Sequence, residues 1–193
     1  MTRLPALIVN FYGGPASGKT TAAARLFVAL KERGTDAEMH DEQARQCIQQ
    51  GQLGALDVQP YLFGLQLYKL RTTVGRTDVV IMDSPILLNP VYDKAQSPAL
   101  RALVLEEYHR FRNLNVVIDR SSTAPHSMVG RVHDRHESTM LDERIVHFLE
   151  EQGVPFERMP QGSPADDLAD RVVAMISRAR HDADPSFLDG IGA

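Results

Sequence analysis

The stretch Gly13-Gly-Pro-Ala-Ser-Gly-Lys-Thr20 decides the fold, because it satisfies the pattern G-x-x-x-x-G-K-[ST]. The apolar run before it, residues 6–11, is continuous rather than alternating, which is typical of a strand buried on both faces. In residues 19–33 the apolar side chains recur at helical spacing until Gly34 supplies a stop signal. The motif therefore lies between a buried strand and a helix, as its chemistry requires.

The motif predicts a site for the phosphates of a nucleoside triphosphate. Its glycines let backbone N–H groups turn inward around an anion, and the helix N-terminus adds partial positive charge. Lys19 is suited to reach the β- and γ-phosphates, and the Thr20 hydroxyl is suited to ligate Mg²⁺. We therefore expect ATP and Mg²⁺ as cofactors. The expected nucleotide-binding residues are Gly13, Gly14, Pro15, Ala16, Ser17, Gly18, Lys19, Thr20 and Thr21.

The rest of the chain alternates strands and helices. Strands are predicted near residues 37–40, 78–83, 115–118 and 154–159, and helices over 42–50, 59–74, 98–111, 138–151 and 164–180. With the phosphate-loop motif, this order predicts an α/β P-loop fold with three layers, a five-stranded parallel sheet and helices on both faces. Residues 1–180 are expected to form one domain with a short arginine-bearing lid at 121–137, and 181–193 a loosely ordered tail.

Composition narrows the range of partners. The chain has 193 residues, a formal net charge of −4 and a single cysteine, Cys47, which cannot form an internal disulfide. We therefore expect a reducing, cytoplasmic location. The longest nearly apolar stretch, residues 4–12, is too short to span a bilayer and lacks the pattern of a signal peptide, so no membrane partner is expected. The oligomeric state is left open.

Asp83 ends the strand predicted at 78–83, where a carboxylate faces the ligand crevice of a parallel sheet. With Thr20, it is the expected Mg²⁺ ligand, as Walker-B acids are. The alternative is that Asp83 caps the turn with Ser84. Lys19 and Asp83 are thus the first two predicted catalytic residues.

Glu42 follows the second strand and is the candidate base for an acceptor hydroxyl. Alternatively Asp41 is an N-cap and Glu42 a first-turn acid. Arg131 is the candidate lid arginine that stabilises the transferring phosphate, unless it belongs to a surface basic loop. The other candidate acceptor-binding residues are Asp41, Arg45, Gln66, Arg71 and Arg135. For Arg45, Gln66 and Arg71 the alternative is a solvated helix face.

These residues resemble a family of small phage-type P-loop kinases, often labelled ATP-binding or AAA-like proteins. The resemblance rests on the segments FYGGPASGKTTAAARLFVALKERG, DEQAR, VQPYLFGLQLYKLR, DVVIMDSPILL and GRVHDRHESTMLDERIVHFLEEQGVPFE. It implies that Glu42 is the acceptor-site acid, Asp83 the Walker-B acid and Arg131 the lid arginine. This chain has Gln43 and Arg45 where those relatives carry an aromatic residue and a lysine.

The family includes kinases that phosphorylate 5-hydroxymethyluracil in phage DNA; more distant relatives phosphorylate nucleosides, nucleotides or nicotinamide riboside. The resemblance thus implies transfer to a modified-DNA or nucleotide acceptor, in the host cytoplasm if the chain is phage-encoded. Because the chain is slightly acidic, DNA would need a local arginine groove and base extrusion. The arginines considered for this groove are Arg71, Arg76, Arg131 and Arg135. The alternative of another class is an ATPase or switch stimulated by DNA or a partner, against which the compact length counts.

Overall fold

The computed structural model describes residues 4–121 and 135–182. Its centre is one parallel sheet with the strand order β2-β3-β1-β4-β5. The strands are β1 (Leu7–Tyr12), β2 (Ala37–His40), β3 (Val79–Met82), β4 (Arg112–Asp119) and β5 (Glu157–Pro160). This confirms the predicted five-stranded α/β fold.

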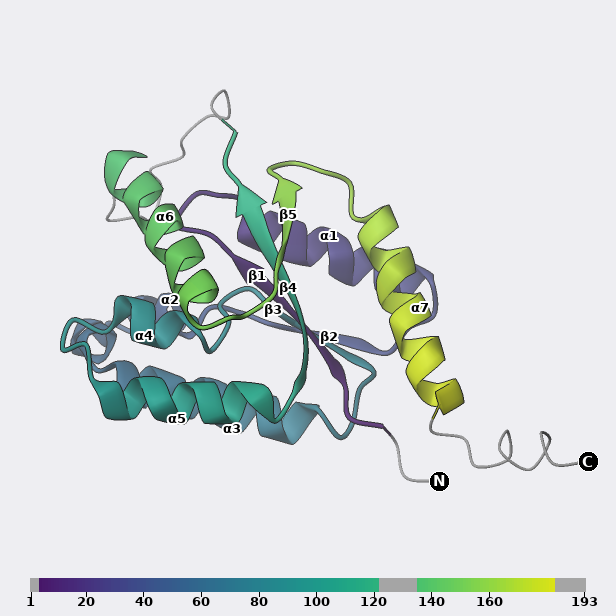
Figure 1. Ribbon diagram of the computed structural model, residues 1–193, viewed down its shortest axis with the longest axis horizontal. Helices are drawn as coiled ribbons and strands as arrows, with labels where there is room; N and C mark the ends of the chain where they lie inside the picture. Colours follow the sequence, from purple (N-terminus) through teal and green to yellow (C-terminus); the bar gives the residue numbers. More distant parts are fainter. Residues whose placement is uncertain (1–3, 122–134, 183–193) are drawn as a thin grey trace, which may run out of the picture.

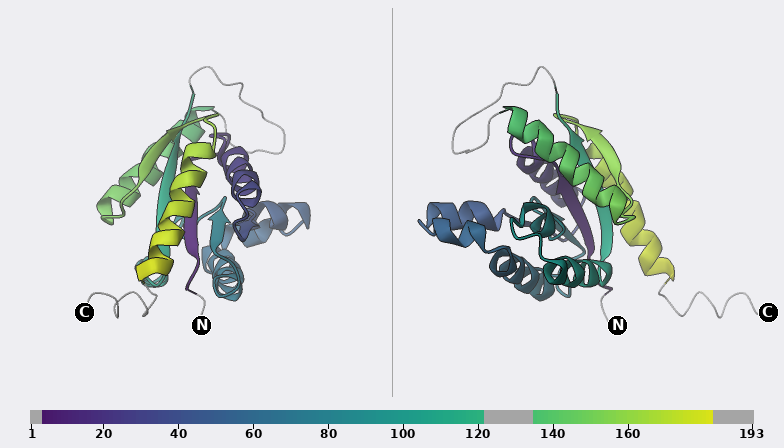
Figure 2. Two further views of the ribbon diagram at one scale, coloured as in Figure 1. Left: turned by 90° about the vertical axis from the view of Figure 1, so that its right-hand side faces the viewer. Right: turned by 60° about the vertical axis from the view of Figure 1, so that its left-hand side comes forward.

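Helices cover both faces of the sheet (Figures 1 and 2). One face packs against α1 (Lys19–Glu32) and α7 (Asp166–Asp182). The other packs against α3 (Gln59–Thr73), α4 (Leu88–Tyr92), α5 (Pro98–His109) and α6 (Arg135–Glu151). Between β2 and α3, α2 (Gln43–Gln49) and the 3₁₀ helix η1 (Leu53–Asp57) project from the body of the molecule.

Alternate side chains of the central strands β1, β3 and β4 pack into the two cores. In β1, Leu7, Val9 and Phe11 join the core under α1 and α7, whereas Ile8 and Tyr12 join the opposite one. The polar residue in this strand, Asn10, is buried and donates to the side-chain oxygens of Asn113 and Asn115 in β4, each at 3.0 Å. Both central layers are thus apolar, and the buried amides are hydrogen-bonded.

The sheet order brings the functional segments to one edge. β1 lies between β3 and β4, with β2 and β3 on one side of it and β4 and β5 on the other. The strand order therefore reverses beside β1. The phosphate loop follows β1, Asp83 follows β3, and Glu42 follows β2 after Asp41, all beyond carboxyl ends of parallel strands. This is the edge at which open α/β sheets bind ligands.

Several boundaries differ from prediction. The helix α4 and the 3₁₀ helix η1 were not predicted, and Pro85 and Pro90 mask the helical pattern of α4. α6 begins at Arg135, so the last three residues of the predicted lid are helical; Glu137 in its first turn complements the helix dipole. Likewise α7 continues to Asp182, into the predicted tail, with Arg180 and His181 in its last turn. No helix in the described ranges is both long and apolar enough to cross a membrane.

Strand β5 also starts later than predicted, at Glu157. Val154 is buried, but it packs in the core near α6 and is not paired with β4. The paired residues alternate between half-buried and exposed, as expected for an edge strand. Hydrophobicity alone therefore placed this strand too early.

Candidate active site

The phosphate loop joins β1 to α1 and is held in a curved conformation by its glycines. Gly18 occupies the N-cap position of α1 with φ of 95°, in the left-handed region that favours glycine. Nζ of Lys19 donates a hydrogen bond to the carbonyl oxygen of Gly14 at 2.9 Å, so the lysine folds back along the loop. The predicted loop residues are therefore assembled as a compact turn at the start of α1.

Thr20 and Asp83 meet beside this loop. Oγ1 of Thr20 donates a hydrogen bond to Oδ2 of Asp83 at 2.6 Å, and Asp83 is only 4% exposed. The other carboxylate oxygen, Oδ1, is buried with no hydrogen-bond partner among the described residues. Asp83 therefore binds Thr20 across the crevice, and we find no sign that it caps the turn at Ser84.

These two residues fit a magnesium ion. A hydroxyl and a carboxylate with a free oxygen are hard oxygen donors, and Mg²⁺ usually combines one or two protein ligands with phosphate oxygens and waters. Within residues 4–121 and 135–182, no group of three or more His, Cys, Asp or Glu side chains could hold a metal alone. The predicted roles of Thr20 and Asp83 therefore depend on the nucleotide supplying the remaining ligands.

Unpartnered buried atoms gather around the loop. Besides Oδ1 of Asp83, the Oγ atoms of Ser17 in the loop and Ser138 in α6 are buried without a hydrogen-bond partner among the described residues. Buried polar atoms without partners cost free energy, so such a cluster favours a polar ligand. Backbone carbonyl O of Ser138 lies close to Gly14, 2.7 Å from the position that a Cβ would occupy there. The loop and α6 therefore bound this polar region together.

Glu42 follows β2, whereas the phosphate loop follows β1. In the strand order, β3 and the Asp83 that follows it lie between them. It occupies the N-cap position of α2, yet its side chain makes no capping hydrogen bond, and it is exposed. The alternative of Asp41 as N-cap and Glu42 as a first-turn acid is therefore wrong, because the N-cap residue is Glu42 and the first turn of α2 holds no acidic residue. The backbone N–H of Asp83 donates to the carbonyl oxygen of His40 at 3.2 Å, which fixes the end of β2 beside the end of β3.

Lys19 lies within electrostatic reach of three carboxylates. Burial lowers the pKa of Lys19 below its usual value, while Asp83, Glu42 and Asp142 oppose this effect and Arg120 adds to it. Glu42, although exposed, is therefore close enough to Lys19 to influence its pKa. The three carboxylates favour the charged ammonium form of Lys19, which is the form suited to phosphate oxygens.

Two predicted acceptor residues are engaged elsewhere. Gln66 is buried: its Nε2 donates to the carbonyl oxygen of Ser84 at 3.2 Å, and its Oε1 accepts from Nδ2 of Asn89 at 2.7 Å. It therefore supports the turn after Asp83 from behind. Arg71 forms two hydrogen bonds with the buried carboxylate of Glu107 in α5, at 2.7 and 2.6 Å.

The structure describes only part of the predicted arginine groove. Arg76 lies three residues before β3, whose first residue pairs with the first residue of β1, so it is at the opposite edge of the sheet from the phosphate loop. Arg71, on α3, forms an ion pair with Glu107 of α5. Arg131 lies outside the described residues, and only the backbone of Arg45 and Arg135 is described. Arg76 therefore does not lie beside the phosphate loop, and a groove formed by Arg71, Arg131 and Arg135 stays a prediction.

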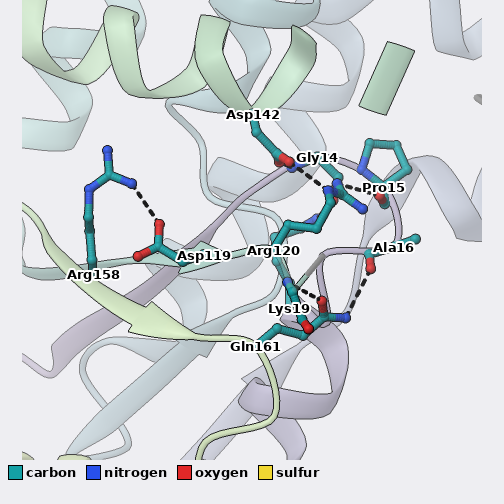
Figure 3. Close-up of polar contacts among 10 residues, drawn as sticks. Gly14, Pro15, Ala16, Lys19, Asp119, Arg120, Asp142, Arg158 and Gln161 are labelled. Carbon is teal, nitrogen blue, oxygen red and sulfur yellow. Dashed lines mark hydrogen bonds and ion pairs between the residues drawn. The ribbon is translucent and has the colours of Figure 1, made fainter. Parts of the chain in front are cut away.

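Arg120 contacts the loop, as do Asp142 and Gln161, which were not predicted (Figure 3). Asp142 of α6 accepts a hydrogen bond from the Gly14 amide, and Arg120, after β4, binds both Asp142 and the carbonyl oxygen of Pro15. Gln161, after β5, donates to the carbonyl oxygen of Ala16 at 3.3 Å and accepts from the amide of Ser121 at 2.9 Å. For Arg120 and Gln161, the sequence signal was their position directly after β4 and β5, because the ends of those strands lie at the ligand edge of the sheet.

A family comparison agrees with this architecture. The model of the AAA domain family matches residues 8–166, which include the phosphate loop, Asp83 and Asp142. The chain belongs to this AAA domain family. Its P-loop NTPase fold is a nucleotide-binding fold. No curated protein matches the chain at a significant level.

The solved structure of NadR has the same fold. The crystal structure of NadR in complex with NR is 19% identical, with a TM-score of 0.67 over 89% of this chain and 51% of the NadR chain. The present chain thus spans about half the length of the NadR chain. Crystal structure APE1195 is 18% identical with a TM-score of 0.40, covering 95% of this chain and 100% of the other. A designed protein with the P-loop NTPase fold is 10% identical with a TM-score of 0.37, covering 90% and 92%.

Proposed function

We propose that this AAA domain protein is a phosphotransferase that moves the γ-phosphoryl group of ATP·Mg²⁺ to a hydroxyl group of a nucleobase or nucleotide. The observation that carries the proposal is the placement of Glu42. Its carboxylate lies near enough to Lys19 to raise the pKa of that lysine, and it makes no capping hydrogen bond to α2. A second carboxylate beside the phosphate loop is what a hydroxyl acceptor requires, because it can orient the hydroxyl and accept its proton.

Each residue has a distinct task in this proposal. The loop amides and Lys19 bind the phosphates, and Thr20 and Asp83 hold the magnesium ion, which neutralises charge on the phosphate oxygens. Glu42 orients the acceptor hydroxyl toward the γ-phosphorus. A cavity of about 600 Å³ runs from Thr20 along α1 to Glu32 and is bounded by Pro164 and by Asp166, the first residue of α7; its end near the loop offers space for the nucleoside part of ATP. Catalysis is then positioning and electrostatic stabilisation.

The acceptor that we propose first is the 5-hydroxymethyl group of 5-hydroxymethyluracil in DNA. Support for it comes from the sequence segments shared with the phage-type kinases, among them DVVIMDSPILL, in which Asp83 lies. The test incubates the protein with γ-labelled ATP and a DNA duplex containing 5-hydroxymethyluracil, beside free nucleosides and nucleotides. Labelled DNA supports this acceptor; label on a free nucleoside or nucleotide alone replaces it, and label released only as inorganic phosphate overturns the phosphotransferase proposal in favour of an ATPase.

A further inference from the structure

Two side chains from other parts of the chain hold the phosphate loop from outside. Asp142 of α6 accepts from the amide of Gly14 with one carboxylate oxygen and from Nε of Arg120 with the other, the latter at 2.8 Å. Nη2 of Arg120 donates to the carbonyl oxygen of Pro15 at 2.9 Å. Both side chains are largely buried, at 13% exposure for Arg120 and 21% for Asp142. One ion pair therefore binds two consecutive residues of the loop.

The same network reaches the lysine of the motif. Lys19 donates to the carbonyl oxygen of Gly14, whose amide is bound by Asp142. Gly14 is thus fixed on both sides, and its position determines where the ammonium group of Lys19 lies. α6 packs so closely here that a Cβ on Gly14 would lie 2.7 Å from the carbonyl oxygen of Ser138. The loop has little freedom to move independently of α6.

We propose that Arg120 and Asp142 are positioning residues for the nucleotide, an inference that rests on the proposed function only in placing ATP phosphates at this loop. Pro15 has no N–H group, so its carbonyl oxygen is its only backbone hydrogen-bonding atom. A carbonyl oxygen turned toward the phosphates would repel them. Arg120 donates a hydrogen bond to this oxygen and keeps it turned away from the phosphates. Asp142 fixes Gly14. Together, the two contacts keep Lys19 and the following amides directed at the phosphates.

A neighbouring ion pair provides a matched control. Asp119, the residue before Arg120, pairs with Arg158 of β5 at 2.6 Å, but these side chains are 43% and 51% exposed. Figure 3 shows this pair directed away from the loop. Exposed pairs contribute little because water screens them, so removing Arg158 tests the effect of losing a nearby charge pair alone.

The experiment measures binding of the fluorescent analogue mant-ATP with Mg²⁺ to the full chain. The variants are Asp142→Asn, Arg120→Gln, the double variant, Arg120→Lys and the control Arg158→Gln. Thermal unfolding without nucleotide identifies which variants are folded. Because the contacts are charge-assisted hydrogen bonds, we expect Kd to rise on the order of tenfold or more in Asp142→Asn and Arg120→Gln. Arg158→Gln should bind as the wild type does.

Three further outcomes decide between positioning and other roles. The Kd of the double variant should be about equal to the higher Kd of the two single variants, because both residues act through one network. Arg120→Lys, which keeps the charge, should recover part of the affinity. Unchanged or tighter binding by folded variants, when the wild type binds, overturns this inference alone. A wild-type protein that does not bind mant-ATP overturns the proposed function as well. If Asp142→Asn does not fold, the comparison of Arg120→Gln with Arg120→Lys carries the test.

Discussion

The hydroxyl of Thr20 donates a hydrogen bond to Oδ2 of Asp83 at 2.6 Å and so joins the first turn of α1 to the end of β3. The remaining oxygen of the carboxylate is buried and has no partner among the described residues. Leaving a carboxylate oxygen unsatisfied is costly unless a ligand compensates. This arrangement makes the Thr20–Asp83 pair the most informative place to test for a magnesium ion.

Replacing Asp83 with Asn should keep an acceptor for Thr20 but remove the charge that holds the metal. We expect phosphoryl transfer to fall on the order of 100-fold, with a higher Mg²⁺ concentration needed for half-maximal activity. A Mg²⁺ titration of transfer rate measures both quantities. An unchanged magnesium requirement would remove Asp83 from the metal site.

Thr20 offers a matched pair of substitutions. Thr20→Ser keeps the hydroxyl that donates to Asp83, whereas Thr20→Val keeps the shape and loses the oxygen. Only the valine variant should shift the magnesium requirement, since only it removes an oxygen donor. Equal effects of both variants would indicate that packing, and not the hydroxyl, matters here.

Glu42→Gln should reduce transfer on the order of 100-fold or more while nucleotide affinity stays close to that of the wild type. The reason is that glutamine can still hydrogen-bond an acceptor but cannot take its proton. Steady-state transfer assays together with mant-ATP binding separate the two effects. Asp41→Asn is measured beside it; if that variant loses more activity than Glu42→Gln, the base is Asp41.

The fold was predictable because its signals are local. The continuous apolar strand β1, the glycine-rich turn and the helical spacing after Lys19 together define the first unit. The edge strand β5 and the short helix α4 were harder, since Val154 extends the apolar run of one and two prolines interrupt the other. Local patterns therefore carried the architecture but not these boundaries.

Gly14→Ala should weaken nucleotide binding and lower the free energy of unfolding. Its Cβ would lie 2.7 Å from a backbone oxygen of α6 and 3.0 Å from Oδ1 of Asp142, so the loop or helix must shift, at on the order of 1–3 kcal/mol. The control is Gly64→Ala on the exposed side of α3, where a Cβ meets nothing within 4 Å. That variant should gain about 0.5–1 kcal/mol, as chemical denaturation would show.

His40 should make the protein less stable in mild acid. Burial, with a contribution from Lys69, lowers the pKa of His40 from 6.5 to about 4, although the half-exposed Glu38 carboxylate lies 3.4 Å from Nε2. Between these values the unfolded chain binds a proton that the folded one does not, so stability rises with pH. From pH 7.5 to pH 5 the free energy of unfolding should fall by about 2 kcal/mol from this residue. Urea denaturation of His40→Gln should show a correspondingly smaller fall, and an equal fall would contradict the assignment.

The site was predictable only where sequence motifs name single residues. The motif named Lys19 and Thr20, and the strand ending at Met82 pointed to Asp83, which the structure places in contact with Thr20. Asp142, a partner of the loop, was not predictable, because it is 128 residues from Gly14 and only the packing of α6 brings them together. Long-range contacts of this kind leave no periodic signal in the sequence.

The most direct test follows the labelled γ-phosphate of ATP. Wild type and Glu42→Gln are incubated with Mg²⁺ and either a 5-hydroxymethyluracil duplex or a thymine duplex of the same sequence, and label on DNA is compared with label in inorganic phosphate. A phosphotransferase should label the hydroxymethylated duplex, leave the thymine duplex unlabelled and lose this transfer in Glu42→Gln. If the wild type releases label only as inorganic phosphate, whatever hydroxyl acceptor is supplied, the phosphotransferase account is contradicted.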